Sequence, residues 1–347
     1  MFKNTLFLKI VLVFTLPALG MLYFSTVLVY EKIQILSELN NVKSNIRYLT
    51  AADNLVHSVQ KERGYSVIYL TSKKFRKELD KQRKQTDLKY SEYVNIISTI
   101  SFDNSQMIYS VKKIQNTFYK MELLRKDMDQ LILPTFDVLI KFNNINELLL
   151  DSIVSISPVQ YASDFNTKLT SMIKLLTAKE FAGIERALTS MVISNNYVVT
   201  EDIYNYLVKL YTVQETNLKE FQLKADILEV NKYNNTISLS TLKEIEKVRA
   251  SIKKHISRKL ISTEEWWDLS TSRIDSLQRV IHFSTVKILI LAKELEAEAY
   301  VAEFLSLGFL LVSFLTLISL FFVLKNIIFN EQKSFNKISK QQKVYDM

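Results

Sequence analysis

The chain has 347 residues, of which only 4 are glycine and 3 are proline, and it contains no cysteine. This composition excludes a glycine-rich phosphate-binding loop and any site built on thiolates or disulfides, and it predicts a chain that is nearly all helix. The formal net charge is +9. Much of that excess lies in the two terminal segments, which argues against a basic surface for nucleic acid.

Two apolar runs, residues 10–30 and 304–324, are each long enough to cross a bilayer as a helix. The first could instead be a cleaved signal peptide, but it continues well past Ala18 and Gly20, which favours an uncleaved anchor. Lysines follow the second run and glutamates precede it. The positive-inside rule therefore places both termini in the cytoplasm.

The two runs divide the chain into five parts. We expect a cytoplasmic N-terminus (1–9), a first transmembrane helix (10–30), a domain outside the membrane (31–303), a second transmembrane helix (304–324) and a short basic cytoplasmic tail (325–347). The expected location is the bacterial inner membrane, crossed twice, with the domain in the periplasm. The tail is too short for a kinase or cyclase domain, so we expect the signalling output in a separate protein or lost by truncation.

Between the runs, hydrophobic periodicity and capping signals predict long amphipathic helices in antiparallel order. The expected helices cover about 31–72, 74–101, 105–133, 135–156, 158–195, 200–228, 238–260 and 262–303, the first and last being continuous with the apolar runs. Pro134 is expected to end the third helix, Ser157-Pro158 and Thr200 to begin two others, and Ser262 with Glu265 to form a capping box. Eight such helices predict an all-α fold of one or two four-helix bundles.

A short internal repeat relates the first and fifth expected helices. Glu62-Arg63-Gly64 and Glu185-Arg186-Ala187 are both Glu-Arg-small triplets that follow an apolar-periodic segment. The repeat predicts two halves of similar build, with two arginines in related positions.

Both arginines lie on faces that helix periodicity predicts to be inward. Arg63 interrupts an apolar stripe, and the same-face neighbours of Arg186 are small or hydroxylated. A buried guanidinium keeps its proton and needs a counter-anion. Two alternatives follow: a small soluble anion between the helices, or an internal ion pair. The partners considered for such a pair are Glu62, Glu180, Glu185 or a carboxylate of another helix.

Three stretches resemble the motifs of a known family. They are residues 54–87, NLVHSVQKERGYSVIYLTSKKFRKELDKQRKQTD; 175–196, LLTAKEFAGIERALTSMVISNN; and 265–277, EWWDLSTSRIDSL. In this order they are similar to the opening, second and final motifs of the nitrate- and nitrite-sensing (NIT) domain, and they span most of residues 45–300. The resemblance implies an all-α ligand-sensing domain of two four-helix bundles.

The resemblance also implies which residues bind a ligand, because arginines are associated with nitrate or nitrite recognition in that family. Arg63 and Arg186 match best, whereas Arg249 and Arg273 lie in looser motifs. We expect a nitrate-sized oxyanion between the first and fifth helices, because a guanidinium presents paired N–H donors to two oxygens of a planar anion. The hydroxyls expected to join the two best-matching arginines are those of Thr189 or Ser190.

Membrane-bound members of the family are input modules of histidine kinases, chemoreceptors and cyclic-dinucleotide enzymes. We therefore expect a sensory receptor for nitrate, nitrite or another small anion, working as a parallel homodimer. The alternative is a helical membrane scaffold that binds a partner protein and senses nothing. A polar pocket around the two arginines would favour the receptor, and a carboxylate paired to each would favour the scaffold.

No catalytic site can be assembled from the residue types present. His57, His255 and His282 are far apart in the sequence, and we interpret them as ordinary polar positions of helices. We expect no enzymatic activity, no metal and no cofactor. Trp266-Trp267 is interpreted as core packing or a bundle-end cap, the alternative being a cation–π ligand cage near Arg258 and Lys259. The basic cluster at 73–83 is interpreted as a solvated helix start.

Overall fold

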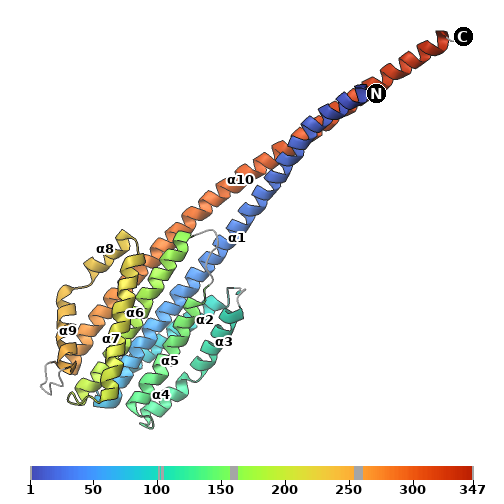
Figure 1. The fold of residues 1–347 in the computed structure, drawn as a ribbon. Helices are drawn as coiled ribbons and strands as arrows, with labels where there is room; N and C mark the ends of the chain where they lie inside the picture. Colours follow the sequence, from blue (N-terminus) through green and yellow to red (C-terminus); the bar gives the residue numbers. More distant parts are fainter. Residues whose placement is uncertain (1, 101, 103–104, 157–162, 254–260, 346–347) are drawn as a thin grey trace. The chain divides into compact units, whose positions relative to one another are not determined.

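The computed structural model describes residues 2–100, 102, 105–156, 163–253 and 261–345. All the regular elements in these residues are helices, so the all-α prediction is confirmed (Figure 1). The helices are α1 (Phe2–Ser72), α2 (Arg76–Ile97), α3 (Ser105–Tyr119), α4 (Met121–Asp129), α5 (Thr135–Val154), α6 (Ser163–Ser194), α7 (Glu201–Lys224), α8 (Ile227–Thr236), α9 (Leu239–Lys253) and α10 (Thr263–Tyr345).

Most helix boundaries follow the local signals. α5 begins directly after Pro134, and the Thr200 hydroxyl caps α7 by accepting a hydrogen bond from the Ile203 N–H. The expected capping box is present at the start of α10: Glu265 N–H donates to the Ser262 hydroxyl at 3.1 Å, and Ser262 N–H donates to the Glu265 carboxylate at 2.7 Å. The start signal Ser157-Pro158 lies outside the described residues.

Two boundaries differ from the prediction. The expected third helix is divided into α3 and α4 at Lys120, whose N–H bonds the Thr117 carbonyl in a tighter turn. The expected sixth helix ends at Lys224, and a further helix, α8, follows. α8 begins with a capping box between Asp226 and Glu229, a signal that is visible in the sequence and was missed.

The chain divides into two compact units. The larger unit, residues 41–292, holds two four-helix bundles: α1, α2, α3 with α4, and α5; then α6, α7, α8 with α9, and α10 (Figure 1). One apolar cluster runs from Val67 of α1 through Leu188 of α6 to Leu207 of α7, Val248 of α9 and Trp266 of α10. The two groups of helices therefore share a core, as expected for a doubled bundle.

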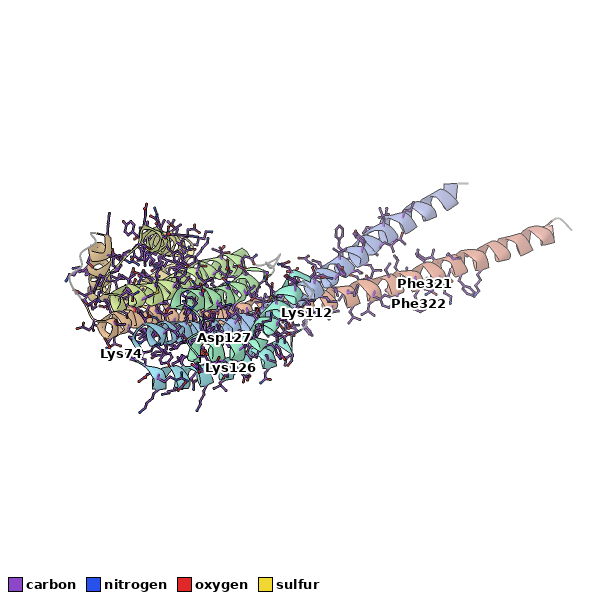
Figure 2. All side chains as sticks on the ribbon, turned by 90° about the horizontal axis from the view of Figure 1, so that it is seen from below. Lys74, Lys112, Lys126, Asp127, Phe321 and Phe322 are labelled. Atoms are coloured by element: carbon purple, nitrogen blue, oxygen red, sulfur yellow. The ribbon has the colours of Figure 1, made fainter. Side chains whose placement is uncertain are left out.

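The smaller unit, residues 1–40 and 293–347, pairs the beginning of α1 with the end of α10. At the centre of this pair, the buried hydroxyl oxygens of Ser25 and Ser313 are 3.1 Å apart. Most large apolar side chains of both segments are exposed, including Phe321 and Phe322 (Figure 2). By length and composition, α1 and α10 each contain a segment that is apolar enough to cross a membrane. The parts of these helices outside residues 41–292 precede and follow the larger unit along the sequence.

Candidate anion-binding site

Two buried arginines meet where α1 packs against α6. The side chains of Arg63 and Arg186 are both 0% exposed. Each is held in place by several neighbouring helices, yet their charges are balanced in different ways. This difference defines the candidate site.

Arg63 is paired with a carboxylate. Its Nη1 donates to Glu180 Oε1 at 2.5 Å and to Asn143 Oδ1 at 2.8 Å. The other oxygen of Glu180 accepts hydrogen bonds from Gln60 (2.5 Å) and Asn146 (3.0 Å). The predicted alternative of an internal ion pair is therefore confirmed for this arginine. Its Nε and Nη2 are buried without a hydrogen-bond partner among the described residues.

Arg186 forms hydrogen bonds only to neutral groups in the described part of the chain. Its Nη1 donates to the Thr271 hydroxyl at 2.9 Å, its Nη2 donates to the Gln60 carbonyl at 3.0 Å, and its guanidinium carbon lies 4.1 Å from the centre of the Trp267 ring. Burial, and then the charge of Arg63, lowers the pKa of Arg186 to about 10. A buried cation without a carboxylate beside it is costly, which makes this guanidinium an attractive partner for an anion.

Glycine allows the arginines to approach the facing helix. A Cβ on Gly183 would lie 2.7 Å from Arg63 Nη2, and a Cβ on Gly64 would lie 2.4 Å from Cζ3 of Trp267, the ring that covers Arg186. Two of the four glycines of the chain thus lie in the middle of helices at this site. Helix-interior glycine lowers helix stability, so each of them has a packing reason to be there.

The two predicted hydroxyl groups also lie at this level of α6. The Ser190 hydroxyl donates to the Arg186 carbonyl at 2.7 Å, a carbonyl that also accepts from Trp266 Nε1 at 3.0 Å. The Thr189 hydroxyl is buried and faces the Tyr211 hydroxyl of α7, whose ring lies against the guanidinium of Arg249. Ser190 uses its proton within α6, and Thr189 faces Tyr211 rather than Arg186.

Arg249 and Arg273 belong to a separate cluster on the other side of α6. Arg249 donates to both oxygens of Glu185 at 2.8 and 2.7 Å, and Arg273 donates to Gln214 Oε1 at 2.7 Å. Burial alone would raise the pKa of Glu185, but the hydrogen bonds from Arg249 outweigh it and lower that pKa. The structure thus brings Arg63 and Arg186 together and places the two weaker candidates around a carboxylate of their own.

The internal repeat is visible in these contacts. In each half, the glutamate before the arginine is held by an arginine of the same half: Glu62 by Arg125 at 2.7 and 2.9 Å, and Glu185 by Arg249. In each half, the guanidinium binds the ninth residue of the last helix, Asn143 in α5 and Thr271 in α10.

The contacts across α1 and α6 are reciprocal as well. Arg63 Nη2 lies against Gly183, three residues before Arg186, and Arg186 Nη2 binds the carbonyl of Gln60, three residues before Arg63. The two contacts differ in kind, a close approach and a hydrogen bond, but they occupy the same place in the two halves, as an approximate two-fold relation requires.

Several residues of the site were not predicted, namely Gln60, Asn143, Asn146, Thr271 and the contact of Trp267 with Arg186. Their polar side chains have no pattern of their own in the sequence. The sequence did contain one signal for close packing at this place, namely the two glycines within predicted helices, Gly64 and Gly183.

The fold and site define an all-helical protein in which a doubled bundle surrounds a buried cationic centre. The family model for nitrate and nitrite sensing, NIT, matches residues 54–282. The chain therefore belongs to the NIT family, a family of sensing rather than catalytic domains. The solved structure of the NasR transcription antiterminator is similar in fold, with a TM-score of 0.70 and 17% sequence identity over 81% of this chain and 82% of that chain. No curated protein matches the chain.

Proposed function

We propose that the chain is a membrane-anchored receptor whose helical domain binds nitrate or nitrite on the outer side of the inner membrane. The observation that carries this proposal is the buried charge of Arg186, which has neutral hydrogen-bond partners and lies close to a second buried arginine. A monovalent oxyanion would balance that charge and accept hydrogen bonds from both guanidinium groups. The free Nε and Nη2 donors of Arg63 are available to the same ligand.

The residues that hold Arg186 connect the site to the apolar segments. Thr271, Trp266 and Trp267 all belong to α10, and Arg63 belongs to α1. A ligand that changes the position of either guanidinium would act directly on the two helices that contain the candidate membrane spans. The homodimer and the separate output partner remain predictions.

The scaffold alternative predicted a carboxylate beside each arginine. Arg63 has one and Arg186 forms no such pair in the described part of the chain, which favours the receptor.

The test is isothermal titration calorimetry of the full chain in nanodiscs with sodium nitrate and sodium nitrite, compared with chloride and sulfate. We expect Arg186→Lys to weaken nitrate binding by about 1.5–3 kcal/mol, the contribution of a hydrogen bond to a charged group, because lysine cannot present two parallel donors. Arg63→Lys should also weaken binding, by a smaller amount, because Arg63 already has Glu180.

The matched control is Arg76→Lys. Arg76 is a half-exposed arginine of α2 that pairs with Asp129, so its replacement should leave nitrate affinity unchanged. Absence of nitrate and nitrite binding in the parent chain, or equal affinity in the folded Arg186→Lys variant, would contradict the proposal.

A further inference from the structure

The internal repeat assigns a counterpart to Glu180. Glu180 lies six residues before Arg186, and its carboxylate crosses from α6 to pair with Arg63 of α1 at 2.5 Å. The residue six positions before Arg63 is His57. Since the contacts three positions before each arginine are reciprocal, the two-fold relation that takes Arg63 to Arg186 also takes Glu180 to His57.

His57 lies among charged groups of both signs. Its Nε2 is 3.7 Å from Asp275 Oδ1, which is also 3.6 Å from Lys61 Nζ. Lys179, buried on α6, donates to Asp53 at 2.5 Å. Lys61 and Lys179 each have a carboxylate within 4 Å, Asp275 and Asp53, whereas Arg186 has none within that distance in the described part of the chain.

The histidine adds no charge of its own. Burial, and then the charges of Lys179, Lys61 and Arg186, hold the pKa of His57 well below 6.5, so the ring is neutral at pH 7. Its Nδ1 is buried without a hydrogen-bond partner among the described residues. A neutral imidazole can offer one N–H donor to an oxyanion.

We infer that the oxyanion binds against Arg186 and beside His57, in the place that the internal repeat relates to the Glu180 carboxylate. This inference rests on the proposed function and gives its ligand a position. Glu180 shows what the related place accepts: a planar monoanion whose oxygens take hydrogen bonds from one guanidinium and two side-chain amides. Nitrate and nitrite share that planar shape and single charge, whereas sulfate is tetrahedral and divalent.

A carboxylate placed at residue 57 tests the position directly. In His57→Glu, the new carboxylate should pair with Arg186 as Glu180 pairs with Arg63 and thereby compete with the ligand. Calorimetry of the full chain in nanodiscs should show nitrate binding weakened at least roughly tenfold, the factor expected when a charged hydrogen bond is lost. The matched control is His282→Glu, the same change at an exposed position of α10, which should keep the parent affinity.

A second measurement decides the question if His57→Glu does not fold. The chain has only three histidines, so their ring signals can be assigned by NMR in the parent protein. Addition of sodium nitrate should shift the ring signals of His57 and leave those of His282 in place.

The outcomes separate the two proposals. Nitrate binding that depends on Arg186 but is unaffected by His57→Glu, or that leaves the His57 ring signals unmoved, would overturn this inference alone. No binding of nitrate or nitrite to the parent chain would overturn the proposed function as well.

Discussion

The positively charged guanidinium of Arg186 is fully buried in the domain. Its hydrogen bonds go to a hydroxyl and a carbonyl, and the face of its guanidinium lies on the Trp267 ring. Neutral acceptors and an aromatic face compensate only part of the lost hydration of a cation. The fold therefore holds this group in a state that an anion would stabilise.

Trp267 can cover Arg186 only because residue 64 has no side chain. A Cβ on Gly64 would lie 2.4 and 2.6 Å from two carbons of the ring, and the ring is enclosed by Tyr65 at 4.5 Å between ring centres. We expect Gly64→Ala to destabilise the domain by about 1–3 kcal/mol, the usual cost of overpacking a core. Thermal unfolding of the full chain, followed by circular dichroism and tryptophan fluorescence, would measure the loss.

Gly20→Ala and Gly308→Ala are the controls for this change. Apart from the chain neighbours and the nearby backbone of the same helix, no described atom lies within 4 Å of a Cβ built at either position, so neither variant should lower the melting temperature. A Gly64→Ala protein that melts with the parent would show that Trp267 is not fixed as described.

The sequence predicted that both arginines face inward, but it did not predict which residues they contact. Arg63 and Arg186 stand out because each places a charge on an inward face of a helix, and Glu180 was one of three named candidates for a partner. The choice among these candidates depends on how α1 and α6 are rotated against each other, which helix periodicity alone does not fix. The Trp266-Trp267 pair was assigned to packing, whereas the structure also places Trp267 over Arg186.

At the scale of elements, a salt-bridge clamp joins α2 to the end of α4. Asp129 accepts hydrogen bonds from Arg83 (2.9 and 2.9 Å) and from Arg76 (2.7 and 3.2 Å). Burial would raise the pKa of Asp129, but the hydrogen bonds from Arg83 and Arg76 outweigh it and lower the pKa from 3.8 to about 2. A lowered pKa means that the folded state favours the charged carboxylate.

This clamp predicts a pH dependence of stability with a definite sign. Its contribution should be complete above about pH 5 and should disappear as the pH falls through about 2. Because Asp129 and Arg76 are partly exposed, we expect Asp129→Asn to cost about 1 kcal/mol at neutral pH. The difference in melting temperature between variant and parent should shrink between pH 5 and about pH 2.5.

Asp151→Asn, a change at an exposed residue of α5, serves as the comparison. It should not show the same pH-dependent difference. A constant gap between Asp129→Asn and the parent across the acid range would rule out the clamp as its cause.

The sequence predicted which segments are helical more reliably than where a long helical segment breaks into two helices. Long apolar periodicity identified every long helix, and the caps at Thr200 and Ser262 fixed two starts. The break at Lys120 has no proline, glycine or cap to mark it. It arises from a tight turn between α3 and α4, which only the packing of the bundle determines.

At the scale of the whole molecule, the two apolar segments give a testable topology. The lysines after residue 324 and the glutamates before residue 304 predict that both termini are cytoplasmic and that the helical domain is outside. Because the chain has no cysteine, single introduced cysteines can be labelled without background. A membrane-impermeant maleimide should label Lys126→Cys in intact spheroplasts, and Lys333→Cys only after permeabilisation (Lys126 is labelled in Figure 2).

Both positions are exposed, so lack of labelling cannot be assigned to burial. Labelling of Lys333→Cys in sealed spheroplasts would show that the topology is inverted or that the second segment does not cross the membrane.

A half-length chain with one Glu-Arg pair could make the contacts between α1 and α6 with a second copy of itself, since each contact has its reciprocal. In such a symmetric dimer, both arginines would have the same neighbour six residues back. Fusion of the halves into one polypeptide removes that constraint, and here the two neighbours are His57 and Glu180. The charge of Arg63 is thereby balanced by a carboxylate of the protein, whereas Arg186 has no carboxylate paired with it in the described part of the chain. Two identical subunits have identical sequences and could not encode this difference.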